Sequence, residues 1–201
     1  MNVRLEYHMN WRAAIWFEDR LQVNDYSAEL SIHTNTTNHQ DHVTCMERIN
    51  HFVYHELTNT VFIKQDNHDQ LRALSAAGIK VTTLPEEPID QIIGIMLYCK
   101  LNAILENRMI ITDVTIQSLL GDNVRYLHNH QESIGPCEQP GWWTECSPTH
   151  SNFKPSAGSK RVVKLNRTPS WRDIDLGWQD EQPPEKKTNT VVYAKFPQDE
   201  N

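Results

Sequence analysis

Hydrophobic and polar residues alternate along the start of the chain, with the period of two that is typical of half-buried β-strands. The alternation runs through residues 3–9 and resumes through residues 11–23. Asn24 and Asp25 form a turn signal, after which residues 26–32 alternate again. We therefore expect an antiparallel hairpin at the start of the chain.

From about residue 41 the hydrophobic period changes to that of an α-helix, which we expect over residues 41–57. A second, short helix is expected over residues 66–77, ended by Gly78, and residues 79–84 are expected to be extended. Residues 89–105 form the most apolar helical pattern in the chain, with apolar side chains around most of the circumference. Such a helix should lie centrally against a sheet.

A second hairpin is expected from residues 109–119 and 124–130, which are separated by Gly-Asp-Asn. The predicted order is therefore strand, strand, helices, strand, strand. This order is typical of an α+β fold in which an antiparallel sheet of two hairpins is backed on one side by two to three helices.

The composition changes near residue 131, which we take as the boundary between an α+β domain (residues 1–130) and an extended, partly docked tail (residues 131–201). Eight of the ten prolines and four of the six tryptophans follow this point. Because tryptophan side chains are costly to leave in water, the tail is expected to lie across a surface of the protein itself or of a partner. The expected partner-binding residues are Trp142, Trp143, Trp171 and Trp178.

The overall charge disfavours a general nucleic-acid-binding protein. The 201 residues contain 19 Lys and Arg against 26 Asp and Glu, a formal net charge of −7, whereas neutralising phosphates needs a positive surface. No segment approaches the roughly 18 consecutive apolar residues of a membrane span, and the first residues lack the pattern of a signal peptide. We therefore expect a cytoplasmic protein.

Ten histidines raise the possibility of a metal site, with zinc as the candidate ion. His39, His42 and Cys45 are close in sequence, and His51 and His55 are spaced so that both lie on one face of the predicted helix. The same spacing is typical of a solvated helix face, and the favoured interpretation is that the protein has no cofactor.

Other catalytic motifs are weak or absent. The sequence has no phosphate-binding glycine loop, dinucleotide fingerprint or nucleophile elbow. Cys137 and Cys146 have His150 nearby in sequence, but proximity in sequence alone is weak evidence for an activated thiol. His128-Asn129-His130 spells a nuclease motif without its flanking sequence, and chance explains it better.

The tail contains one basic segment with two interpretations. Lys160, Arg161, Lys164 and Arg167 alternate with aliphatic residues and are followed by Trp171, a combination that suits weak binding to single-stranded nucleic acid. It equally suits an edge strand whose charges discourage aggregation, which is the favoured interpretation.

The order of elements over residues 3–130 resembles the tunnelling fold of pterin and purine enzymes, which includes the carboxytetrahydropterin synthases. In that family, one histidine from the first strand and an HxH pair from the second hold zinc, and a carboxylate anchors the pterin ring. The resemblance implies His8, His33 and Asp113 as catalytic candidates. The second strand offers only His33, so the metal triad of the family is incomplete here.

A second resemblance rests on short stretches of sequence. The segment LPEEPIDQIIGIMLYCKLNAI, the following ITD and the later GP…GWW are similar to stretches in uncharacterised proteins of T4-like cyanophages. This resemblance implies a phage-encoded protein in the host cytoplasm or the virion, and it implies no mechanism.

Two functions follow from these patterns. The first is a non-enzymatic accessory or interaction protein that binds a protein partner, or itself, through its aromatic tail or a sheet edge. The alternative is a divergent tunnelling-fold enzyme that acts on a pterin or purine-like small molecule.

Overall fold

The computed structural model describes residues 4–121, 123–149 and 169–180. It contains one six-stranded sheet with the strand order β4-β3-β1-β2-β5-β6. The strands are β1 (Arg4–Phe17), β2 (Arg20–Thr34), β3 (Val61–Lys64), β4 (Val81–Leu84), β5 (Met109–Ser118) and β6 (Arg125–Asn129). The helices are α1 (His39–His51), which continues as the π-helix η1 (Phe52–Leu57), α2 (His68–Ala76) and α3 (Asp90–Leu105). Three short 3-10 helices follow: η2 (Gly135–Glu138), η3 (Trp142–Thr144) and η4 (Trp171–Ile174).

The expected α+β fold is confirmed, but the sheet is mixed rather than antiparallel throughout. The hairpins β1–β2 and β5–β6 are antiparallel, and β2 and β5 also pair antiparallel. β3 and β4 instead join the β1 edge in parallel. Parallel neighbours need a crossover connection, which α1 with η1 supplies before β3 and α2 supplies before β4.

The first hairpin turns earlier than the sequence predicts. The turn lies at Glu18 and Asp19, both with positive φ (48° and 56°), and not at Asn24-Asp25. Two consecutive residues in the left-handed region make the kind of turn that matches the twist of a two-stranded hairpin. The apolar residues after this turn, Leu21 and Val23, are exposed, so the alternation there does not mark a core face.

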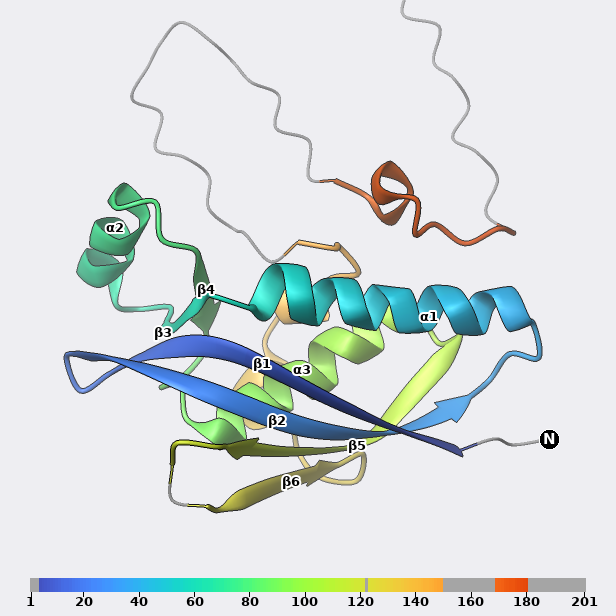
Figure 1. Ribbon diagram of the computed structural model, residues 1–201, viewed down its shortest axis with the longest axis horizontal. Helices are drawn as coiled ribbons and strands as arrows, with labels where there is room; N and C mark the ends of the chain where they lie inside the picture. Colours follow the sequence, from blue (N-terminus) through green and yellow to red (C-terminus); the bar gives the residue numbers. More distant parts are fainter. Residues whose placement is uncertain (1–3, 122, 150–168, 181–201) are drawn as a thin grey trace, which may run out of the picture.

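α1 and α3 cover one face of the sheet, and residues 169–180 lie over α1 on the side away from the sheet (Figure 1). The expected central position of α3 is confirmed, because its apolar side chains are buried around most of the helix between β5, β6, α1 and η3. Gly94 permits close contact with the sheet, since a Cβ atom there would lie 2.9 Å from Cγ2 of Ile116. No helix of the described residues is long and apolar enough to cross a membrane.

Two buried cations fix the C-terminal segments onto this core. Arg48 of α1 is 1% exposed, and Lys100 of α3 is fully buried. Arg48 contacts residues 169–180, and Lys100 contacts the segment around η3. Burial of an ion requires that its hydrogen-bonding groups be satisfied by the protein, so these two side chains determine where the C-terminal segments pack.

Candidate functional site

The three candidates implied by the tunnelling-fold resemblance share the open face of the sheet but do not converge. His8 is opposite Glu29, and its Nδ1 lies 3.6 Å from Glu29 Oε1. His33 lies four residues beyond Glu29 on β2, a separation of roughly 13 Å at the rise of an extended strand. Asp113 lies 3.9 Å from Arg4 and accepts a hydrogen bond from Thr112 Oγ1 at 2.7 Å.

The rest of this open face is a network of exposed ion pairs. Arg12 donates two hydrogen bonds to Asp25, at 2.7 and 2.9 Å. Arg125 lies 3.8 Å from Glu29 and donates to Gln117 at 3.1 Å. Exposed pairs of this kind contribute about 0–1 kcal/mol each. The face has the character of the solvated side of a sheet.

The histidines and the cysteine at the start of α1 point to different partners. His39 is exposed, whereas His42 Nε2 lies 2.8 Å from the carbonyl oxygen of Thr36. Cys45 is fully buried in the core, and burial raises the pKa of its thiol to about 12. In the part of the chain that the structure describes, no three His, Cys, Asp or Glu side chains are grouped so that they could hold a metal ion.

His51 and His55 do come together, at the junction of α1 and η1. Their rings stack with centroids 4.8 Å apart, and His51 also contacts the edge of Trp171. Burial lowers the pKa of His51, and the neighbouring His55 lowers it further. The two rings line an open cavity of about 460 Å³ between this helix and residues 174–176.

Trp142 and Trp143 are buried against their own domain. Trp142 is 1% exposed and donates from Nε1 to the carbonyl oxygen of Thr83 on β4, at 2.8 Å. Trp143 donates from Nε1 to the carbonyl oxygen of Cys137, at 3.0 Å. Both rings are therefore buried in the core of the protein, whereas the sequence analysis expects them to bind a partner.

Trp171 and Trp178 enclose the guanidinium group of Arg48. The Arg48 Cζ atom lies 4.7 Å from the centroid of the Trp171 ring and 3.8 Å from that of Trp178, which are distances of cation–π contacts. Trp171 Nε1 donates to the carbonyl oxygen of Cys146. These rings too are buried within the chain that carries them. The basic candidates Lys160, Arg161, Lys164 and Arg167 lie outside the described residues.

A second cavity, of about 310 Å³, lies between α3 and the strands β5 and β6. Its lining combines apolar and polar side chains, and polar atoms form the larger part of the exposed cavity surface. The polar lining residues are Gln91, His128, Glu132 and Ser133, and the others are Gly94, Ile95, Val114, Ile116, Tyr126 and Leu127. We call this cavity the α3–β6 pocket.

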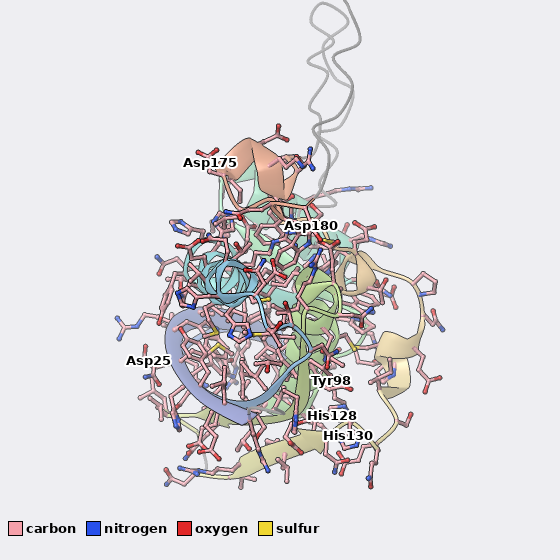
Figure 2. All side chains as sticks on the ribbon, turned by 90° about the vertical axis from the view of Figure 1, so that its right-hand side faces the viewer. Asp25, Tyr98, His128, His130, Asp175 and Asp180 are labelled. Carbon is pink, nitrogen blue, oxygen red and sulfur yellow. The ribbon has the colours of Figure 1, made fainter. Side chains whose placement is uncertain are left out.

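His128 is the central polar side chain of the α3–β6 pocket. It is 6% exposed, its Nδ1 lies 3.5 Å from Glu132 Oε2, and Tyr98 packs against its ring with centroids 4.7 Å apart. Figure 2 shows Tyr98, His128 and His130 on the same side of the molecule. The Nε2 atom of His128 is buried and has no hydrogen-bond partner among the described residues. Buried polar atoms are usually hydrogen-bonded to the protein, to water or to a bound group.

Burial lowers the pKa of His128, and Glu132 partly opposes this effect. The imidazole is therefore neutral near pH 7, with one nitrogen able to accept a proton or a hydrogen bond. Sequence reasoning missed this residue because His128-Asn129-His130 was judged only as a nuclease motif. The available signal was its alternation with Tyr126, which places both side chains on the helix-covered face of β6.

Acid should destabilise the protein partly through His128. The folded pKa lies below the unfolded value, so as pH falls below about 6.5 the unfolded state binds a proton that the folded state does not. We expect the free energy of unfolding, measured with urea, to decrease between pH 7 and pH 5 and to decrease less in His128→Asn. An exposed-site variant, His39→Asn, should keep the wild-type slope. Equal slopes in all three proteins would contradict the assignment.

Comparisons with known proteins give similarity of fold only. No family model matches the chain, and no curated protein sequence matches it. A solved structure of an uncharacterised protein from Wolinella succinogenes is 9% identical, with 65% of this chain and 99% of that chain covered and a TM-score of 0.48. The 6-pyruvoyl tetrahydropterin synthase of Plasmodium vivax is 13% identical over 64% of this chain and 99% of its own, with a TM-score of 0.42.

The corresponding synthase of Plasmodium falciparum is 10% identical over 63% of this chain and 96% of its own, with a TM-score of 0.39. Two of these three solved structures are thus of pterin synthases, the class of enzyme named in the resemblance. Similarity at this level assigns neither a family nor an activity to the chain.

Proposed function

We propose that the protein binds a small planar heterocycle with hydrogen-bonding edges, of the pterin or purine type, in the α3–β6 pocket. The observation that carries this proposal is His128, a buried side chain in the pocket wall with an unpartnered Nε2 and a carboxylate beside Nδ1. The pocket volume of about 310 Å³ lies at the lower end of the roughly 300–1,000 Å³ of small-molecule sites.

The polar groups of the pocket suit this ligand class. Glu132 Oε2 accepts a hydrogen bond from the Asn129 N–H at 3.3 Å and lies near His128, and the half-exposed side chain leaves Oε1 as a further acceptor. A carboxylate accepts two parallel N–H bonds from a planar donor edge, and pterins and guanine share such an edge. The apolar walls from Ile95 and Ile116 suit the faces of a flat ring. This is the small-molecule class of the alternative function expected from sequence.

The test is to measure the binding of pterin to the full chain by isothermal titration calorimetry. We expect saturable binding that Glu132→Gln weakens by about tenfold or more, because the lost carboxylate bond to an N–H pair is worth about 1.5–3 kcal/mol. Glu29→Gln, on the opposite face of the sheet, is the matched control and should bind normally. Failure of the native chain to bind pterin or guanine would refute the proposal, as would equal affinities in the two variants.

A specific observation also favours the interaction protein expected from sequence. The His130 N–H donates to Thr112 O, and Asn129 is opposite Asp113. The alternation of an antiparallel ladder then directs the backbone N–H and C=O of Leu127 away from β5. Leu127 is 61% exposed, whereas Trp142 covers the opposite edge of the sheet at β4.

As the second candidate function, we propose self-association by pairing of β6 with β6 of a second copy. An open edge strand with an exposed leucine is a template for strand addition. Sedimentation velocity on the native chain should show a concentration-dependent dimer that Leu127→Lys abolishes. Leu21→Lys, at another exposed leucine near the hairpin tip (48% exposed), should leave the dimer intact. A monomer at all concentrations, or equal loss in both variants, would refute this candidate.

A further inference from the structure

Two of the four cysteines meet at the contact between α3 and η2. Cys99 lies in α3 and is partly exposed, while Cys137 lies in η2 and is fully buried. The two side chains lie close enough that each is the main influence on the pKa of the other's thiol, and both pack in one cluster where α3 contacts η2. Both thiols are free, and both belong to the hydrophobic core that α3 forms with the segment after β6.

The backbone around Cys137 is held in place from both sides. Its N–H donates to the carbonyl oxygen of Ile134 at 3.0 Å, and its carbonyl oxygen accepts from Trp143 Nε1 at 3.0 Å. Trp143 is itself 3% exposed. Cys137 is therefore fixed against α3, so its sulfur stays next to that of Cys99 without movement of a loop.

The other two thiols lack such a neighbour and are harder to ionise. Burial raises the pKa of Cys45 to about 12, and burial with the nearby Glu106 raises that of Cys146 to about 11. The neighbouring Cys137 side chain lowers the pKa of Cys99. Because the thiolate is the reactive form, Cys99 is the thiol among the four that an oxidant should attack first.

We propose that Cys99 and Cys137 are a redox-sensitive pair that forms an intramolecular disulfide when the protein meets hydrogen peroxide. This inference does not depend on the proposed ligand of the α3–β6 pocket. The segment that carries Cys137 also carries the pocket residues Glu132 and Ser133, so the disulfide would tie one pocket wall covalently to α3.

The reaction has two balanced steps. The Cys99 thiolate attacks one peroxide oxygen, the O–O bond breaks, and the hydroxide released takes up a proton as water, leaving Cys99 as a sulfenic acid. The Cys137 sulfur then attacks the Cys99 sulfur, the S–O bond breaks, and the departing hydroxide leaves as water with the Cys137 proton. The two thiols lose two electrons and two protons, and one peroxide is reduced to two waters.

The test uses the native full chain treated with a few equivalents of hydrogen peroxide, quenched with catalase, unfolded and alkylated with N-ethylmaleimide. Intact-mass analysis should show two alkylated thiols instead of four. After the mass of the alkyl groups is subtracted, the protein should be lighter by about 2 Da, the two hydrogens lost when a disulfide forms. Proteolysis should give a cross-linked peptide pair containing Cys99 and Cys137. Dithiothreitol should restore four alkylated thiols.

Three variants separate this pair from other thiol chemistry. Cys137→Ser should abolish the cross-link and leave a Cys99 sulfenic acid that dimedone traps, and Cys99→Ser should abolish both. Cys146→Ser, the matched control, should still form the cross-link. Four alkylated thiols in the oxidised native chain, or a cross-link that joins a different pair, would overturn the proposal.

Discussion

Replacing Arg48 with methionine is expected to lower the free energy of unfolding by about 3–5 kcal/mol, the range for breaking a buried charged network. The guanidinium group donates to the carbonyl oxygen of Leu176 at 2.9 Å, to that of Ile104 at 2.9 Å and to Glu106 Oε1 at 2.6 Å. Ile104 lies in the last turn of α3, where carbonyl groups lack helical partners and a cation is favourable. Methionine fills the space but leaves these acceptors without their donor.

The measurement is urea denaturation of Arg48→Met beside Arg12→Met. Arg12 also binds a carboxylate, that of Asp25, through two hydrogen bonds, but its side chain is 64% exposed. Its loss should therefore change the urea midpoint far less than the loss of Arg48. Equal stabilities of the two variants would show that the Arg48 contacts do not hold residues 169–180 in place.

Replacing Lys100 with methionine is expected to cost about 3 kcal/mol, because three carbonyl groups lose one donor and each unsatisfied group costs about 1–3 kcal/mol before relaxation. The Lys100 ammonium donates to the carbonyl oxygens of Trp142, Glu145 and Ser147, at 3.1, 2.6 and 2.8 Å. Burial lowers the pKa of Lys100 to about 8, and the nearby Cys146, Glu145 and Glu56 side chains partly oppose this effect.

Lys64→Met provides the comparison for this second variant. Lys64 forms an ion pair with Glu86 at 2.7 Å, with side chains 27% and 50% exposed, so its loss should change the urea midpoint little. Lys100→Met should also make the chain easier to cleave by protease near Glu145, because the segment after η3 loses its attachment to α3. A Lys100→Met protein as stable as Lys64→Met would contradict this account.

The central helix and the two hairpins were predictable because their side-chain periods are long and uninterrupted. α3 carries sixteen residues of mainly apolar sequence, and β5 alternates over ten. β3 was missed because Val61–Lys64 is four residues long and buried on both faces, so it shows no alternation. Without β3, the parallel edge of the sheet could not be inferred.

The candidate site was less predictable, since it depends on contacts between distant elements. Nothing in the local sequence links Tyr98 on α3 with His128 on β6, and a histidine in an alternating strand has no special pattern. Similarly, nothing in the local sequence marks Arg48 and Lys100 as buried cations. The tryptophans of the tail, which the sequence analysis expects to bind a partner, lie in the buried core, and their cationic neighbours could not be identified from composition.

The buried cations also determine which shortened forms of the chain are reasonable to produce. A gene fragment that ends after β6 would leave the Arg48 guanidinium and the Lys100 ammonium without the carbonyl groups of Leu176, Trp142, Glu145 and Ser147. Such a fragment would retain every strand of the sheet. Lys100 would lose all three of its carbonyl acceptors, and Arg48 would keep Ile104 and Glu106 but lose Leu176. For expression and crystallisation, the unit to preserve therefore extends at least through Asp180, which receives two hydrogen bonds from Arg108.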